Sequence, residues 1–543
     1  MTGLKVQLVF PPVTRPRDFS SDQVRISPFF PLGLAYLAAA LIADDVADVA
    51  VLDALVEGDI NDPQEEHDLI RFGLSDSEIE RRLLEKNPDV VGVSCLFAAQ
   101  ETDAVNICRI AKKTNPKIVT VLGGVHPGTR SHKLLEEHPE VDYIVLGEGE
   151  QTFKELITNL DNPGTVSGVA FLDNGQYRAT ARKQFLENLD SLPFPARNLF
   201  PMRKYLDLAT PHSGFKNIPF TQMITSRGCS ARCTFCALGN HWGNRQRKRS
   251  AGNVLDEITH LVETYGIREI HFEDDNLTAD RQRAVELFTG LTNRFSGLTW
   301  TVPTGMAVFS LDDELLRKMR DSGCYSVSLA IESGSQWVLS KLMRKPVKLE
   351  RVPGLVRKLR ELGMESRGFF ILGYPGETME TMRQTIDYAR SLELDWAHFF
   401  VAAPLPGTEM FRQCIEKGYM KEEDFDPVRS FHRAVISTPE FTPGDVETLR
   451  EEAIIDVNFK HNANLLKYDP ARAIESFLMV IKHYPHFDFA NFYLGEAYLK
   501  VGDVQKALRY WQKTLDQNPE HREARERLKI HGTVVVEKRE EQP

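Results

Sequence analysis

The sequence contains no apolar run that approaches the ~18–20 residues a membrane-spanning helix needs. Its first residues, "MTGLKVQLVFPP", place one lysine before a short apolar run, which is the pattern of a β-strand and not of a signal peptide. We therefore expect a cytoplasmic protein without a membrane span, in a compartment where disulfides are rare.

A surplus of positive charge is also missing. The 543 residues include 77 acidic and 66 basic side chains, for a net charge of −11. Proteins that bind nucleic acid usually neutralise phosphates with excess lysine and arginine, so we expect no nucleic-acid partner. One basic island, "RQRKR" (245–249), is expected to be a solvated helix start or a local phosphate or carboxylate contact.

Cysteine is scarce, yet three of the seven cysteines fall within "SRGCSARCTFCALG" (226–239), at Cys229, Cys233 and Cys236. Disulfides do not fit the compartment or the odd number. Structural zinc takes four ligands, usually from two separated knuckles, and the sequence has no second cysteine knuckle. The other four cysteines occur singly, and we expect each to be a small buried apolar side chain: Cys95, Cys108, Cys324 and Cys414. A four-iron cluster normally takes four thiolates, so three would leave one iron open to a substrate or cosubstrate.

Two β/α series follow one another along the chain, which is too long for one core. Residues 1–160 alternate apolar runs with helical patterns, which predicts a doubly wound, Rossmann-like α/β domain with its ligand crevice at the carboxyl ends of the strands. Residues 161–215 are expected to be a linker with some β structure. Six further βα units in 216–415 fit a partial (βα)6 TIM-type barrel, with chemistry at the strand carboxyl ends.

The remaining chain has helical patterns. We expect a helical connector over 416–460, a helical unit over 461–530 and a polar tail over 531–543. Within the unit, Ala473, Phe477 and Pro485 recur 34 residues later as Ala507, Trp511 and Pro519. This recurrence resembles the tetratricopeptide repeat (TPR), and the unit is expected to dock on the barrel as a stabilising cap or as a platform for a partner protein. Because the motifs with chemistry precede residue 415, we expect a chain cut near residue 440 to keep its cluster.

The CxxxCxxC triplet, with Phe235 inside its last gap and just beyond the first barrel strand, resembles the radical S-adenosylmethionine (SAM) superfamily. The resemblance implies a [4Fe-4S] cluster held by Cys229, Cys233 and Cys236, with SAM on the open iron and Phe235 near these cofactors. An electron, supplied by a donor such as flavodoxin or ferredoxin, would cleave SAM to a 5′-deoxyadenosyl radical that takes hydrogen from an unactivated carbon.

Three further strand ends match this family and imply SAM contacts, in "FEDDN" (272–276), "IESGS" (331–335) and "FFILGYPGET" (369–378). By resemblance, Glu273 and Asp274 hold the SAM amino group, although helix capping is an alternative for both. Glu332 and Ser333 would face the ribose or the amino-acid end, and Gly373 the adenine, unless it is a turn glycine. The stretch "PTGMAVFS" (303–310) lacks the arginine that many relatives carry, so no residue is assigned to the SAM carboxylate.

The first 160 residues resemble the B12-binding domain of cobalamin-dependent radical SAM enzymes, in "SCLF" (94–97), "GGVHP" (123–127) and "GEGE" (147–150). A GxGxxG fingerprint after the first strand is missing, which argues against a dinucleotide. The implied cobalamin contacts are Ser94, Leu96, Gly123, Gly124, His126, Gly147 and Glu148. "DALVEGD" (53–59) lacks the histidine that methionine synthase-like domains place on cobalt, so either cobalt has no histidine ligand or the domain has lost B12. His126 lies in a different loop and is expected to form a hydrogen bond there.

Together these resemblances imply a cobalamin-dependent radical SAM enzyme that methylates an unactivated carbon of a small molecule or natural-product intermediate through methylcobalamin. The alternative is an anaerobic porphyrin-ester cyclase type, or another ring-forming or rearranging enzyme without methyl transfer. A tRNA-modifying radical SAM enzyme would be expected to carry a basic domain, and a scaffold protein would need no cluster.

Overall fold

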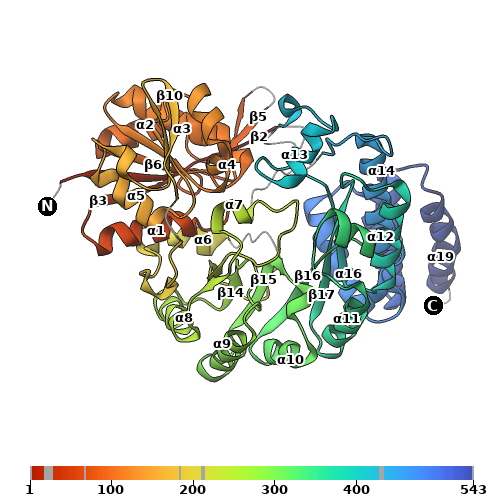
Figure 1. Cartoon of the computed structure of the whole chain (residues 1–543). Helices are drawn as coiled ribbons and strands as arrows, with labels where there is room; N and C mark the ends of the chain where they lie inside the picture. The colour runs from red at the N-terminus through yellow and green to blue at the C-terminus, as the bar shows by residue number, and fades with distance from the viewer. Residues whose placement is uncertain are drawn as a thin grey trace.

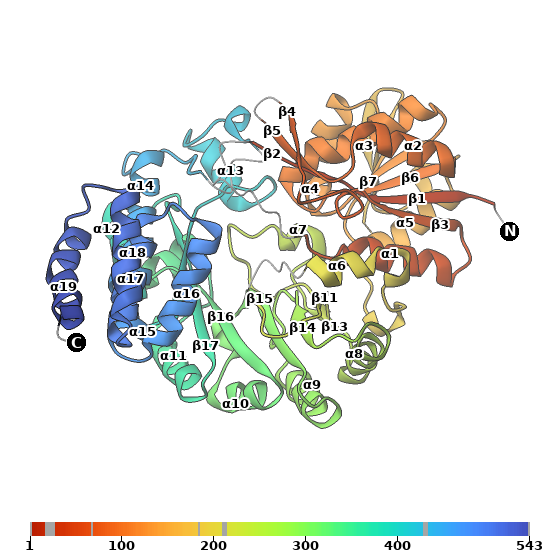
Figure 2. The same cartoon turned by 180° about the vertical axis from the view of Figure 1, so that it is seen from behind.

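The computed structural model describes residues 3–16, 28–66, 69–182, 185–208, 214–426 and 433–540. An N-terminal sheet domain and a C-terminal row of helices lie at opposite ends of a central barrel (Figures 1 and 2). No helix within these ranges has both the length and the apolar character needed to span a membrane.

The N-terminal domain is built on a seven-stranded sheet of order β10-β9-β8-β7-β6-β1-β3. Its five parallel strands are β1 (Lys5–Phe10), β3 (Asp48–Asp53), β6 (Val90–Ser94), β7 (Val119–Gly123) and β8 (Tyr143–Val145). The helices are α1 (Leu32–Ala43), α2 (Asp76–Lys86), α3 (Glu101–Thr114), α4 (Val125–Glu137) and α5 (Gly149–Thr158). Because α1 packs on α5 and α2 on α3, this is the doubly wound, Rossmann-like sheet that the sequence predicted.

The sheet continues into the stretch expected to be a linker. There β9 (Val169–Asp173) pairs antiparallel with β8, and β10 (Gln176–Ala179) pairs antiparallel with β9. α6 (Met202–Leu208) follows. A separate small antiparallel sheet consists of β2 (Val13–Pro16), β5 (Leu69–Phe72) and β4 (Gln64–Glu66).

The central barrel has six parallel strands in sequential order and stays open between its first and last strands. The strands are β11 (Phe220–Met223), β14 (Glu269–Phe272), β15 (Thr299–Met306), β16 (Cys324–Glu332), β17 (Glu365–Leu372) and β18 (Trp396–Val401). The helices are α8 (Ala251–Tyr265), α9 (Arg281–Arg294), α10 (Asp313–Asp321), α11 (Val352–Glu361), α12 (Met379–Ser391) and α13 (Glu409–Glu416). The predicted partial TIM-type barrel is therefore confirmed.

Side chains on β17 alternate strictly between buried and half-buried positions. Gly368, Phe370 and Leu372 are buried, whereas Phe369 and Ile371 between them are half-exposed. One face of the strand is thus packed into the apolar core, and the other lines the interior of the open barrel.

A two-stranded ribbon closes the loop that carries the clustered cysteines. β12 (Ser226–Arg227) pairs antiparallel with β13 (Arg247–Lys248), and the loop between them includes α7 (Leu238–Trp242). In both views α7 lies between the N-terminal domain and the barrel (Figures 1 and 2).

The C-terminal helices include the expected tetratricopeptide pair. They are α14 (Pro443–Ile455), α15 (Ala463–Leu466), α16 (Pro470–His483), α17 (Asp488–Lys500), α18 (Val504–Gln517) and α19 (Arg522–Glu540). Phe477 on α16 and Trp511 on α18 are fully buried, and a Cβ on Gly495 would lie 2.4 Å from the Trp511 ring. A small residue at position 495 is therefore needed for α17 and α18 to pack. The helix α19 covers most of the stretch expected to be a polar tail.

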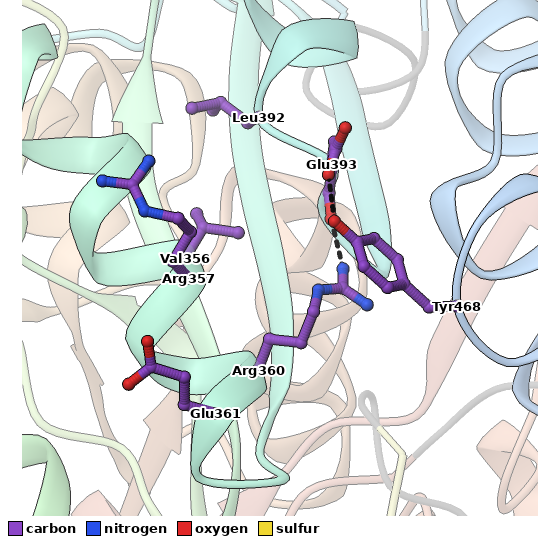
Figure 3. Close-up of a pocket in the computed structure, with 7 residues that line it drawn as sticks. All are labelled: Val356, Arg357, Arg360, Glu361, Leu392, Glu393 and Tyr468. Atoms are coloured by element: carbon purple, nitrogen blue, oxygen red, sulfur yellow. Dashed lines mark hydrogen bonds between the residues drawn. The ribbon is translucent and has the colours of Figure 1, made fainter.

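The helices after residue 440 cover the last barrel strand. The Asn458 side chain accepts a hydrogen bond from the Ala397 amide (2.8 Å) and donates one to the Ala397 carbonyl (2.7 Å). The Asn458 amide therefore pairs with both backbone groups of Ala397 on β18, the last strand of the six-stranded sheet in the described part of the chain. Further along, the Arg360 guanidinium of α11 lies 3.9 Å above the Tyr468 ring. Figure 3 shows this junction, a surface hollow on the outside of the barrel.

Candidate cluster and cofactor site

The cysteine loop begins with a tight turn at Gly228. Gly228 has φ +86°, and a Cβ there would lie 2.6 Å from the Arg245 carbonyl oxygen, so only glycine fits. Its amide donates to Asp275 Oδ2 (2.8 Å). Beyond the turn Cys229, Cys233 and Cys236 are all free and half-exposed, whereas the four single cysteines are buried as the sequence predicted.

The loop is anchored from three sides through Thr234. The Thr234 amide donates to the Met343 carbonyl (3.1 Å), and its hydroxyl donates to the Leu342 carbonyl (2.8 Å) and also contacts the Tyr374 hydroxyl. The Met410 amide donates to the Thr234 carbonyl (2.9 Å). Segments after β16, after β17 and in α13 therefore fix the loop at the barrel mouth.

A buried ion pair stands beside the cysteines. Lys345 Nζ donates to Glu332 Oε1 (2.8 Å), 13 residues away in sequence, and lies 5.9 Å from the Phe235 ring centre. Burial alone would lower the pKa of Lys345, but Glu332 and the thiols of Cys233 and Cys236 outweigh it and raise the pKa. Lys345 is therefore a fixed positive charge at the cysteine loop.

The donor set fits an iron–sulfur cluster better than a single ion. Among the residues described, no three His, Cys, Asp or Glu side chains converge on one metal position. In a four-iron cluster each thiolate binds a different iron, so convergence on one point is not required. Burial raises the pKa of Cys233 and brings that of Cys236 to about 11, and iron would replace the thiol protons.

The two acidic residues predicted as SAM contacts at the end of β14, Glu273 and Asp274, differ in burial and in hydrogen bonding. Asp274 is fully buried, and it accepts hydrogen bonds from the Thr225 amide (3.1 Å) and hydroxyl (2.7 Å) and from the Ser226 hydroxyl (2.5 Å). It therefore braces the strand that leads to the cysteines. Glu273 is half-buried, and burial followed by the nearby Asp274 raises its pKa to about 8. Asp274 is thus committed to the strand before the cysteines, whereas Glu273 is less buried at the same strand end.

The two residues predicted as SAM contacts after β16, Glu332 and Ser333, have different surroundings. Glu332 has φ +73°, a conformation that a residue with a side chain rarely adopts. Ser333 is fully buried, and its hydroxyl lies 3.1 Å from the Thr385 hydroxyl and accepts from the Ser335 amide (3.1 Å). Ser333 thus shapes the turn, while Glu332 reaches the cysteine loop through Lys345.

Gly373, expected near adenine, has a packing role in this structure. It has φ +80°, and a Cβ there would lie 2.9 Å from the Val446 side chain of α14. Position 373 therefore requires glycine, because α14 approaches the backbone closely there.

Four of the predicted cobalamin contacts lie together at the ends of β6 and β7: Ser94, Leu96, Gly123 and Gly124. Ser94 pairs with Gly123 across the sheet. A Cβ on Gly123 would meet nothing within 4 Å, whereas one on Gly124 would lie 2.3 Å from the Cys95 carbonyl oxygen. The open space above Gly123 fits the close approach of a corrinoid, and Gly124 is needed for the turn itself.

The other three predicted contacts are engaged within the protein. His126 is buried and its Nε2 contacts the Glu101 carboxylate. Gly147 faces the α7 region, with the His241 carbonyl oxygen 3.6 Å from a built Cβ. Glu148 uses one carboxylate oxygen for Arg227 and Arg247 and the other for the Leu186 amide.

Sequence reasoning missed three charged residues of the site: Lys345, Arg227 and Arg247. Lys345 follows Glu332 by a spacing that matches no helix or strand period. Arg227 and Arg247 are buried at the base of the cysteine loop, although the basic island containing Arg247 was expected to be solvated or to make a local contact. The arginine missing from the third-strand motif was the available signal, because it left the SAM carboxylate without a partner.

Family models match three segments of the chain. They are a B12 binding domain over residues 26–157, the radical SAM superfamily over 223–389 and a tetratricopeptide repeat over 489–521. The chain is 35% identical over 479 residues to the cytidylyl-2-hydroxyethylphosphonate methyltransferase of Streptomyces wedmorensis, covering 81% of this chain and 87% of that one. It is 29% identical over 499 residues to an uncharacterized methyltransferase of Pyrococcus horikoshii, covering 88% and 99%.

A solved structure has the same fold over nearly the whole chain. It is the radical S-adenosylmethionine methyltransferase TsrM of Kitasatospora setae, with cobalamin and a [4Fe-4S] cluster bound. The TM-score is 0.66 at 19% identity, covering 94% of this chain and 100% of that one.

Proposed function

Because the chain belongs to the cobalamin-dependent radical SAM methyltransferases, we propose that it methylates a carbon of a small molecule held between the barrel mouth and the end of the N-terminal sheet. The observation that carries this proposal is the cysteine loop, which lies beside the buried Lys345–Glu332 pair and is ion-paired at its base to the N-terminal domain. A [4Fe-4S] cluster, SAM and cobalamin are the cofactors.

The three cofactors have candidate positions on different elements. We assign Cys229, Cys233 and Cys236 as the cluster ligands, and the sheet edge at Ser94 and Gly123 as the cobalamin side. When bound, the cluster and SAM would supply the radical chemistry that activates the substrate carbon, and cobalamin would supply the methyl group. The protein's own task is to hold these parts in place and to keep water away from them.

Lys345 supplies the charge that the third-strand motif lacks. Its ammonium is fixed by Glu332 and lies at the cysteine loop. We assign it to the SAM carboxylate, with Glu332 holding Lys345 in place, and we assign Glu273 to the amino group by its resemblance to the family motif. Charge-assisted hydrogen bonds of this kind are shorter and stronger than neutral ones.

The interior of β17 and β18 offers a surface for the substrate or the adenosine. Phe369 and His398 are register neighbours, with ring centres 5.4 Å apart, and Phe400 lies 5.8 Å from Phe369. Burial, followed by the nearby Arg367, lowers the pKa of His398 to about 4. His398 is therefore neutral at pH 7 and can both donate and accept a hydrogen bond.

The proposal extends to partners and compartment. The cluster needs an external electron donor, and flavodoxin or ferredoxin is the class we assign. The tetratricopeptide helices are the candidate platform for a partner protein. We place the enzyme in the cytoplasm, where thiols are kept reduced.

The test begins with the cysteines. After anaerobic reconstitution, replacing Cys229, Cys233 or Cys236 with Ala should abolish the iron–sulfur absorbance and the formation of 5′-deoxyadenosine. Cys108→Ala, a buried cysteine in the N-terminal core, is the matched control and should keep both. A triplet variant that cleaves SAM at the wild-type rate would refute the assignment.

The substrate test uses SAM with a labelled methyl group. Cytidylyl-2-hydroxyethylphosphonate, the compound for which the Streptomyces relative is named, is the first candidate, and tryptophan, bound in a structure of TsrM, is the second. Transfer of label to a carbon of either compound would support methylation. A cyclised, unlabelled product from a substrate would instead indicate a ring-forming enzyme.

A further inference from the structure

Four charged side chains form a buried network between the N-terminal domain and the cysteine loop. Arg227 contacts Glu148 (3.0 Å) and Glu150 (2.5 Å), and Arg247 contacts the same Glu148 oxygen (2.6 Å). Each side chain is at most 12% exposed. We call these four residues the bridging network.

The bridging network has a specific place in both halves. Glu148 and Glu150 lie where β8 leads into α5, at the carboxyl end of the N-terminal sheet. Arg227 and Arg247 are register partners in the β12–β13 ribbon. Because all three clustered cysteines lie between these two arginines in the sequence, the network contacts the cysteine loop at both of its ends.

The surroundings of the network hold the charges in one geometry. Arg227 lies 4.8 Å from the Trp242 ring centre and 5.5 Å from that of Tyr36, and Arg247 lies 4.8 Å from that of Phe185. Burial alone would raise the pKa of Glu150, but the Arg227 guanidinium outweighs it and lowers the pKa. Two arginines and two glutamates balance, so the network is neutral as a whole.

Such a network is poorly explained as a source of stability alone. Desolvation cancels much of the attraction in a buried ion pair, and apolar residues of the same size often stabilise equally well. What charged pairs with directed hydrogen bonds provide is a single allowed arrangement of the two surfaces. Here the two surfaces are the sheet edge at Ser94 and Gly123, which we call the corrinoid-binding edge, and the cysteine loop, which we call the cluster loop.

We propose that Arg227, Arg247, Glu148 and Glu150 are positioning residues that fix the separation and orientation of the cluster loop relative to the corrinoid-binding edge. The proposal rests on the proposed function, since it assigns the two cofactors to those two sites. It also gives the "GEGE" motif a role other than the predicted cobalamin contact.

The test measures geometry and not turnover. The reconstituted full-length protein is reduced so that cobalamin is cob(II)alamin and the cluster is paramagnetic. The cluster then speeds the spin relaxation of cob(II)alamin, and the effect falls steeply with distance. Glu150→Gln should keep iron and corrinoid contents near wild type but lose much of this enhancement.

Two further variants keep the test decisive. Glu150→Asp keeps the charge but shortens the side chain. If only the charge balance mattered, the relaxation enhancement would stay at its wild-type value. If the network positions the loop, the enhancement should change. Asp395→Asn alters a buried carboxylate within the barrel, 4% exposed, and should leave the enhancement unchanged. If Glu150→Gln does not fold, Glu150→Asp decides.

The outcomes separate the two proposals. Wild-type protein that binds no corrinoid would overturn the proposed function and the positioning role with it. Wild-type protein with both cofactors, and Glu150 variants with unchanged relaxation, would overturn the positioning role alone. Loss of either cofactor from Glu150→Asp would also overturn it, because the network would then serve cofactor retention.

Discussion

Glu332 combines an unfavourable backbone conformation with a buried charge. A non-glycine residue at positive φ costs on the order of 1–3 kcal/mol, and such strain persists only where the surrounding structure imposes it. Here the conformation aims the carboxylate at Lys345, beside the cysteine loop. Strain at this residue therefore coincides with the position where we place SAM.

Replacing Lys345 with Met should weaken SAM binding. A hydrogen bond to a charged group is worth ~1.5–3 kcal/mol, so the dissociation constant should rise about 10- to 150-fold. Equilibrium binding of SAM to reconstituted protein measures this.

The control for Lys345 is Lys341→Met, an exposed lysine in the preceding turn, which should bind SAM normally. Because Lys345→Met leaves Glu332 buried without its partner, Lys345→Met combined with Glu332→Gln separates SAM binding from folding. Wild-type affinity in the folded double variant would refute the assignment.

Glu377 should make stability depend on pH. Burial raises its pKa from 4.5 to about 8, against the Tyr374 and Gly373 amides, which lower it. A carboxyl group with a raised pKa in the folded state binds its proton more tightly when folded. The contribution of Glu377 to the free energy of unfolding is therefore full below the pKa of the unfolded state. It is lost as the pH rises towards the pKa of the folded state, by ~1.4 kcal/mol per pH unit between the two.

The melting temperature at about pH 6 and about pH 9 tests this contribution. Glu377→Gln should lower the difference between the two values, because the amide does not ionise. Glu380→Gln, at an exposed position on α12, should leave the difference unchanged. An equal difference in wild type and Glu377→Gln would refute the prediction.

At the residue scale, the three cysteines could be proposed as cluster ligands from the sequence because their spacing is a local signal. Sequence reasoning could not tell Glu273 from Asp274, because the distinction depends on Thr225 and Ser226, which lie 49 and 48 residues before Asp274. Neither could it find Lys345, which meets Glu332 only because the turn after β16 brings the two side chains together.

At the scale of elements, the paired glycines after β7 have opposite tolerances. Gly123 faces open space, whereas Gly124 has φ +129° and a Cβ there would collide with the Cys95 carbonyl. Gly123→Leu should therefore preserve the fold and lose most of the bound cobalamin, as measured by corrinoid content of the purified protein.

The matched control is Gly164→Leu, where a Cβ also meets nothing within 4 Å and which lies outside the corrinoid-binding edge. It should retain cobalamin. Full corrinoid content in a folded Gly123→Leu protein would move the cobalamin site elsewhere. Gly124 variants are uninformative here, since they disturb the turn itself.

Elements with a regular apolar period were predictable, and those made by long-range contact were not. The alternation along β17 and the runs of the N-terminal strands report burial directly. The β12–β13 ribbon contains two residues per strand, too few for any period. The network at its base pairs residues 77 to 99 positions apart, and no local pattern predicts such pairs.

At the scale of the whole molecule, the helices after residue 440 belong in part to the barrel. Val446 packs over Gly373, and Asn458 hydrogen-bonds both backbone groups of Ala397 on β18. The expectation that a chain cut near residue 440 would keep its cluster does not fit these contacts.

We expect instead that a chain ending near residue 440 fails to hold a folded barrel, whereas one ending at residue 468 assembles its cluster. The second chain keeps Val446, Asn458 and Tyr468, although exposure of Phe459 should lower its melting temperature, because Phe459 stacks on Phe477. Solubility, iron content and absorbance of the two chains measure this. A chain cut at 440 that loads its cluster as wild type would refute the prediction.

The Asn458 contact has a consequence for the order of synthesis. Ala397 and Asn458 are 61 residues apart, so a ribosome adding ~5–20 residues per second leaves the β18 edge uncovered for about 3–12 s. During that time the nascent barrel has an edge that can pair with other chains. The final closure of the barrel therefore waits for its C-terminal helices, and iron and SAM meet a finished site only late in translation or after release.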